Sequence, residues 1–274
     1  MSAKTPGLMY ASLRVFDLSL GEMLWSRRTV FMALVVGLPV LLSLVVRALF
    51  ELGAPIRVMG GAAAGPVIFG LMIWVFFVRF SVPVLAVFYG TSLIADEVED
   101  KTITYLFSRP IPRGAVLLGK YLAYLACTVF VVLPAIVLVW LLIVPIQGSL
   151  GPSFPDLVVD LGLVALGLTV YGALFALFGA LLRRPLLSGL IYVFGWETFV
   201  LLMPGYLKRV SVAYYLQGLV PHAMPGDSAV SLIQSIVRDI PSLAESLVFL
   251  GIIEVLCLWF AARAVATREY VLEQ

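Results

Sequence analysis

Apolar runs long enough to cross a lipid bilayer constrain this chain more than any other feature of its sequence. A membrane-spanning helix needs about 20 mostly apolar residues, and several such runs occur between Thr29 and Val265. The composition agrees, because 62% of the residues are hydrophobic and only 12% are charged, whereas soluble domains carry roughly 25% charged residues. From 274 residues we expect one polytopic, all-α integral membrane domain and no separate soluble catalytic domain.

Six transmembrane helices are predicted, over residues 29–50, 66–95, 117–144, 157–182, 186–203 and 243–265. Residues 1–28 precede them as a cytoplasmic interfacial (elbow) segment, and residues 266–274 follow them as a cytoplasmic tail. We expect the second span to be one long tilted helix that Pro83 kinks, because no turn residues surround Arg79. Prolines punctuate residues 204–242, which predicts short re-entrant or interfacial helices on the outer face.

Residues 8–26 have the spacing of an amphipathic helix. One side carries Met9, Leu13, Phe16, Leu20, Met23 and Leu24, and the other carries Arg14, Asp17, Gly21 and Glu22. This pattern is typical of a helix that lies in the membrane interface. A cytosolic helix packed on a loop is the alternative.

The distribution of Lys and Arg predicts the orientation. With a cytoplasmic N-terminus, twelve of these residues fall on the inner side and five on the outer side. The inner set is Lys4, Arg14, Arg27, Arg28, Lys101, Arg109, Arg113, Lys120, Arg183, Arg184, Arg263 and Arg268; the outer set is Arg47, Arg57, Lys208, Arg209 and Arg238. Cytoplasmic loops of membrane proteins carry such an excess. We therefore expect both termini in the cytoplasm of a cell whose inner (cytoplasmic) membrane holds the chain.

Several chemistries find no support in the sequence. Gly114, Gly119 and Lys120 match part of a phosphate-binding loop, but Tyr121 stands where the magnesium-binding Ser or Thr is needed and no strand precedes the match. The single histidine, His222, lies in the predicted outer loop without a catalytic motif around it. The net charge of +2 does not favour nucleic-acid binding. We predict no catalytic, cofactor or metal site in this chain.

Ionisable side chains inside spans are functional candidates by default, because they are costly to place in lipid. Arg79, Glu197 and Glu254 lie within predicted spans. Arg79 and Glu197 fall in the outer half, so we expect them to pair, whereas Glu254 falls near the middle. In the alternative, Arg79 extends outward and Glu197 faces water.

The fourth span carries small residues at intervals of four, namely Gly172, Ala176 and Ala180. Such a face lets two helices approach closely. It predicts packing within a helical bundle and only weakly a particular dimer.

A dense group of charges interrupts the apolar sequence over residues 94–121, here called the charged segment. Acidic residues gather near its beginning, and Ser108, Arg109, Pro110 and Pro112 predict a sharp end to a short helix. A short amphipathic helix held between two spans suits a docking element. A solvated loop with interfacial anchors is the alternative.

The order of residues in the charged segment resembles that of permeases of type 2 ABC exporters. The resemblance rests on Glu97, Thr102, Leu106, Ser108, Arg109, Pro110, Arg113, Gly119 and Lys120, and on the predicted topology of the whole chain. Members of that family often have Gly before the Thr, where this chain has Lys101.

This resemblance implies the membrane half of an ATP-driven transporter. Its partners would be a second permease copy or homologue, two cytosolic ATP-binding cassette subunits and the lipid bilayer, and the partner subunits would bind ATP and Mg. The charged segment would then be the coupling helix, with contacts to the ATPase from Glu97, Glu99, Asp100, Thr102, Arg109, Pro110 and Arg113. The expected cargo is a lipophilic or peptide-like molecule.

Two other functions stay open at this stage. An ion- or proton-coupled secondary transporter would use Arg79, Glu197 and Glu254 as its pathway, although no inverted repeat is visible. A non-transporting membrane partner, such as an assembly or immunity factor, would leave the turnover of an ATPase unchanged.

Overall fold

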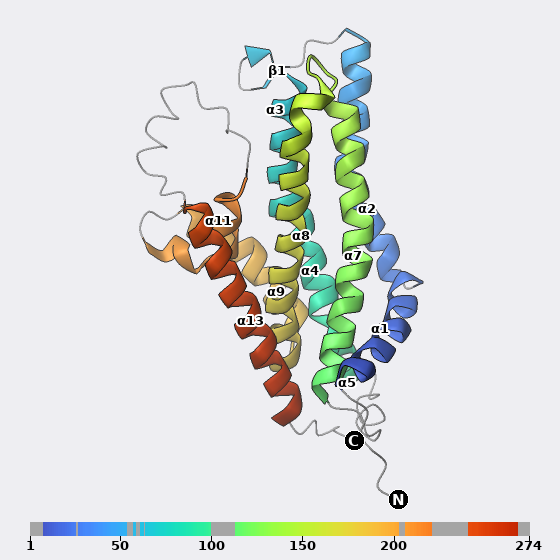
Figure 1. Cartoon of the computed structure of the whole chain (residues 1–274), viewed down its shortest axis with the longest axis vertical. Helices are drawn as coiled ribbons and strands as arrows, with labels where there is room; N and C mark the ends of the chain where they lie inside the picture. Colours follow the sequence, from blue (N-terminus) through green and yellow to red (C-terminus); the bar gives the residue numbers. More distant parts are fainter. Residues whose placement is uncertain are drawn as a thin grey trace, which may run out of the picture.

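Helices make up nearly all of the structure, a computed structural model that describes residues 8–25, 27–53, 57–58, 61–62, 64–99, 113–202, 206–220 and 241–267 (Figure 1). The prediction of an all-α integral membrane protein is confirmed. The described β-structure is one antiparallel pair of two-residue strands, β1 (Arg57–Val58) and β2 (Gly61–Ala62), which the sequence did not predict.

Five helices of the described chain are long and apolar enough to cross a membrane. They are α2 (Arg27–Glu51), a composite helix over Gly65–Asp96, α7 (Arg113–Ile143), α8 (Leu150–Leu181) and α13 (Leu243–Thr267). In Figure 1, α1 (Leu8–Leu24), the lower part of α7 and the short helix α5 lie together at one end of the bundle, here called the α5 end. The strands and α3 lie at the opposite end, here called the α3 end.

The composite helix contains four parts, α3 (Gly65–Met72), η1 (Ile73–Ser81), α4 (Val82–Gly90) and α5 (Ser92–Glu99). The expected single long second span is therefore what the structure shows. The η1 part is π-helical and ends at Ser81, two residues before Pro83. Proline has no backbone N–H to donate, so the helix departs from α-geometry close to the residue that removes a donor.

The predicted span over residues 186–203 corresponds to a shorter helix. It comprises α9 (Pro185–Leu190), the π-helical η2 (Ile191–Glu197) and α10 (Thr198–Leu202). Its apolar part covers Pro185–Val200. At about 1.5 Å per residue this part reaches about 24 Å, less than the hydrocarbon thickness of about 30 Å.

The α8 helix begins earlier than predicted, at Leu150 and not at Leu157. Gly151 and Pro152 are residue types common in loops, yet both lie in the first turn of the helix. The first N–H groups of a helix have no intrahelical acceptor, so a proline there removes no hydrogen bond.

Small residues bring the central helices together. The composite helix and α8 have the most buried apolar windows, 61% and 56%, against 28% for both α2 and α13. Gly172, Ala176 and Ala180 of α8 are all buried within the chain. A Cβ on Gly172 would collide with the ring of Tyr124 on α7. The small-residue face is therefore used for packing inside one subunit.

Two short helices follow α10 in the sequence, η3 (Tyr206–Val210) and α11 (Val212–Gln217). In Figure 1, α11 lies beside the first turns of α13. Pieces too short to span were predicted in this region; residues 221–240 of it lie outside the described residues.

Candidate functional site

The charged segment is described at its two edges. The backbone of Glu97 and Glu99 belongs to the last turn of α5, and Arg113 is the first residue of α7. Asp100, Thr102, Arg109 and Pro110 lie outside the described residues. The coupling helix stays a prediction, whereas the two helices that enter and leave the segment are defined.

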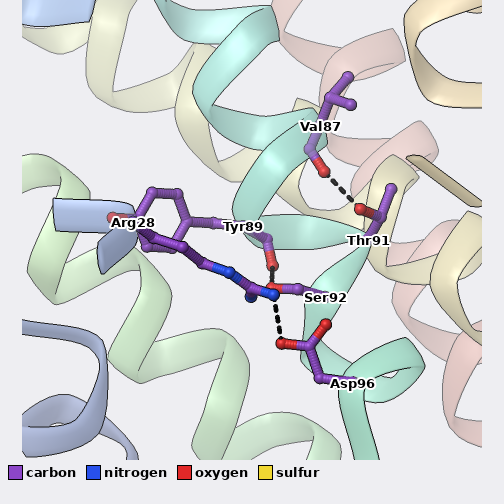
Figure 2. A network of polar contacts seen from close by, with 6 residues as sticks. All are labelled: Arg28, Val87, Tyr89, Thr91, Ser92 and Asp96. Atoms are coloured by element: carbon purple, nitrogen blue, oxygen red, sulfur yellow. Dashed lines mark hydrogen bonds and ion pairs between the residues drawn. The ribbon is translucent and has the colours of Figure 1, made fainter. Parts of the chain in front are cut away.

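A polar network holds the edge that enters the segment (Figure 2). Arg28, at the start of α2, contacts Asp96 of α5 through Nη2 and Oδ2, which are 2.6 Å apart. The side chains of Thr91 and Ser92 donate to carbonyl oxygens of the preceding turn, those of Val87 at 2.6 Å and Tyr89 at 2.8 Å. The ion pair therefore links the first turn of α2 to the helix that leads into the charged segment.

The other edge is packed against α1. A Cβ placed on Gly119 of α7 would lie 2.6 Å from the carbonyl oxygen of Ser12 and 2.7 Å from Cβ of Val15. The absence of a side chain at Gly119 thus permits the contact between α1 and α7. Lys120, the next residue, is 9% exposed.

The buried side of α1 differs from its apolar stripe. Ala11, Ser12 and Ser19 are buried, whereas Met9 and Leu13 are 79% and 56% exposed. The small residues face inward because α1 packs closely on α7, and the large apolar residues are left for the surroundings. An interfacial helix presents such residues to lipid.

The junction of α4 and α5 contacts α8 directly. A Cβ on Gly179 would collide with the carbonyl oxygen of Thr91 and lie 3.1 Å from its carbonyl carbon. A Cβ on Gly90 would lie 3.0 Å from Cβ of Phe175. Backbone therefore meets backbone just before the helix that enters the charged segment.

The three predicted intramembrane residues do not bond directly to one another. Among the described ion pairs and hydrogen bonds, none joins any two of Arg79, Glu197 and Glu254, so the expected pair of Arg79 and Glu197 is not formed. Glu197 is 3% exposed and bonds to α11 instead, which also excludes the alternative in which it faces water.

Glu254 lies on α13 opposite a tyrosine of α7. The Tyr121 hydroxyl is 3.2 Å from Oε1 of Glu254 and 2.8 Å from the carbonyl oxygen of Thr169 on α8. Because a hydroxyl has one proton, it can donate to one of these acceptors at a time. The contact ties α7, α8 and α13 together.

A fourth ionisable residue lies inside a span and was not predicted. Asp160 of α8 has no exposed surface. It lies three residues inside the predicted fourth span, so the rule that singled out Glu197 applied to it equally. Ser211 and Tyr192, both partners of Glu197, also escaped prediction, because a hydroxyl in an apolar run gives no signal of its own.

A known protein family matches most of the chain. The family described as ABC-2 family transporter protein matches residues 28–264. The chain belongs to the ABC-2 transporter family. No curated protein sequence matches it.

An ABC-2 family member is a membrane subunit of an ABC transporter, is not itself catalytic, and works with ATP-binding subunits. The match covers the charged segment and all predicted spans except the last residue of the sixth, and it begins at Arg28, so α1 precedes the matched range. In this ABC-2 subunit α5 and the start of α7, the two helices that flank the charged segment, lie at the α5 end.

Proposed function

We propose that this ABC-2 subunit is the permease of an ATP-driven exporter in the cytoplasmic membrane, with both termini in the cytoplasm. Two separate ATPase subunits bind ATP and Mg and dock on the charged segment. A second permease copy or homologue completes the translocation path. The cargo is a lipophilic or peptide-like molecule.

The observation that carries the proposal is the family match together with the place of the charged segment. Its two flanking helices reach the same end of the bundle, where the Arg28–Asp96 pair braces α5 and the close contact at Gly119 seats α1 on α7. If a docked ATPase subunit moved the charged segment, the movement would act on α5 and α7, and both of these helices are packed against neighbouring helices. Packed elements transmit displacement because they are not continuously deformable.

The composite helix would carry such a displacement from the α5 end to the α3 end of the bundle. It runs unbroken from Gly65 to Asp96 and changes geometry at η1 and Pro83. Kinks in long helices arise at proline and at π-helical turns. In the proposed cycle, closure of the ATPase pair moves α5, and the composite helix bends at η1 to open the path between the two permeases.

Co-purification tests the docking site. We expect the chain to purify with its ATP-binding subunit, and we expect the charge reversals Glu97→Lys and Glu99→Lys together to abolish the complex. The matched control reverses two exposed carboxylates of α1 at the same end, Asp17→Lys and Glu22→Lys. This control should retain the complex. If the complex survives reversal at Glu97 and Glu99, the charged segment is not the dock.

A further inference from the structure

One buried carboxylate, that of Glu197, joins the helix over Pro185–Leu202 to the short helix α11. Glu197 ends η2, and four donors approach its side chain. The Tyr192 hydroxyl donates to Oε1 at 3.0 Å, the amide of Val212 to Oε1 at 3.1 Å, the amide of Ala213 to Oε2 at 3.3 Å, and the Ser211 hydroxyl to Oε2. Three of these four donors belong to α11 or to the residue that precedes it.

The chemistry of this arrangement requires a carboxylate. An ionised carboxylate only accepts hydrogen bonds, so its two oxygens suit four donors. The amides of Val212 and Ala213 lie in the first turn of α11 and have no acceptor within that helix. Ser211 supplies the N-cap by accepting from the amide of Tyr214 at 3.4 Å. A glutamine at position 197 would turn an NH2 group toward donors.

The carboxylate is also shielded from solvent. Glu197 is 3% exposed and Ser211 is fully buried. Hydrogen bonds to a charged group in a low-dielectric interior are stronger than those at a surface. Once formed, this set of bonds is therefore costly to break.

The network extends toward the composite helix. Tyr171 of α8 interacts electrostatically with Glu197, Tyr192 and Arg79. Arg79 lies in η1, and Glu197 lies in η2. Each π-helical segment of the described chain thus carries one residue with a formal charge, and both residues interact electrostatically with the same tyrosine.

We propose that Glu197 is a positioning residue that locks α11 to the Pro185–Leu202 helix, so that the two move as one body. The inference rests on the proposed function, because the motion is the one that ATP drives. α11 is packed within the subunit, because Val212, Tyr215 and Leu216 are each at most 2% exposed. Breaking the Glu197 bonds would free α11 without removing any apolar contact.

Thiol accessibility tests the lock. The probe is a cysteine at position 216, from Leu216→Cys, in a chain whose native buried Cys127 and Cys257 are replaced by alanine. A membrane-impermeant maleimide is applied to the full-length chain in nanodiscs with its ATP-binding subunits. We expect slow labelling in this background and labelling at least about tenfold faster after Glu197→Gln, since two strong acceptor interactions are lost.

Two further variants guard against loss of folding. Ser211→Ala keeps the carboxylate and removes one donor, and it should speed labelling by a smaller factor. Glu51→Gln, the control, removes an exposed carboxylate that pairs with Arg47 at the α3 end of α2, and its rate should be unchanged. If Glu197→Gln and Ser211→Ala both label at the background rate, Glu197 does not hold α11 and the proposal is overturned.

The one-body motion needs a second measurement. Spin labels on Leu187 of α9 and Gln217 of α11 report the distance between the two elements in nucleotide-free and ATP-trapped complexes. We expect this distance to stay constant in the background chain and to change between the states after Glu197→Gln. A distance that changes in the background chain would overturn the proposal. Failure of the ATP-binding subunits to bind would instead refute the proposed function, and the labelling rates would still judge the lock.

Discussion

The contact of Gly179 with the α4–α5 junction predicts a specific cost for adding one methyl group. In Gly179→Ala the new Cβ would lie 3.1 Å from the carbonyl carbon of Thr91 and 3.3 Å from its Cα, and closer still to its carbonyl oxygen. Carbon atoms in contact prefer about 3.5–4.0 Å, so the helices must separate by at least about 0.4 Å. Because the obstacle is backbone, no rotamer change relieves it.

The magnitude follows from two opposed terms. Overpacking a core costs about 1–3 kcal/mol, and replacing glycine by alanine within a helix returns about 0.5–1 kcal/mol. The net loss lies between about 0 and 2.5 kcal/mol, and its central value of about 1.3 kcal/mol lowers the unfolding midpoint of a chain of this size by about 3–5 °C. Gly162→Ala is the control on the same helix, since a Cβ there meets nothing within 4 Å. It should leave the midpoint unchanged or raise it slightly.

Intrinsic tryptophan fluorescence during heating in detergent would measure both variants. A Gly179→Ala protein that unfolds at the same temperature as Gly162→Ala would refute the reasoning, because it would mean that α8 and the α4–α5 junction are not in backbone contact. The comparison is made between two α8 variants, so the general effect of alanine on helix stability cancels.

Three further results are expected. Arg28 and Asp96 are 42% and 36% exposed, so a double-mutant cycle with Arg28→Gln and Asp96→Asn should give a coupling of about 0–1 kcal/mol in thermal unfolding, and a larger coupling would indicate a buried pair. Gly119→Ala should loosen α1 and speed its proteolysis in detergent, whereas Gly37→Ala, where a Cβ has open space, should not. Tyr121→Phe should destabilise the fold by about 1 kcal/mol through the lost hydrogen bond, measured by thermal unfolding, and an unchanged midpoint would contradict that role.

The hydrophobic sequence alone predicted most of the helices. Runs of apolar residues marked four of the five long spans to within a few residues at most ends, because the length of a run reports directly whether a helix can sit in lipid. The start of α8 was placed seven residues too late, since Gly151 and Pro152 have the composition of a loop but lie in a helical first turn. The helix over Pro185–Leu202 was found as well, although its apolar part is shorter than a typical span.

The side-chain contacts were predicted less well. The sequence placed Arg79 and Glu197 at similar depth, and the structure gives Glu197 partners from α11 instead. It placed Met9 and Leu13 on the side of α1 expected to be embedded in the membrane interface, and both are exposed on the surface of the chain. The sequence did not predict that the small residues Ala11 and Ser12 of α1 would be buried.

The sequence by itself determined that this chain is a bundle of membrane helices with one dense charged segment between the second and third spans. Burial of apolar residues in lipid is a local property, so it can be read from each run separately. Only the tertiary structure decided that Glu197 holds α11, that Gly179 admits Thr91 and that Gly119 admits α1. Lipid gives no hydrophobic preference for one helix face over another, and therefore close packing and hydrogen bonds between distant residues set the final arrangement.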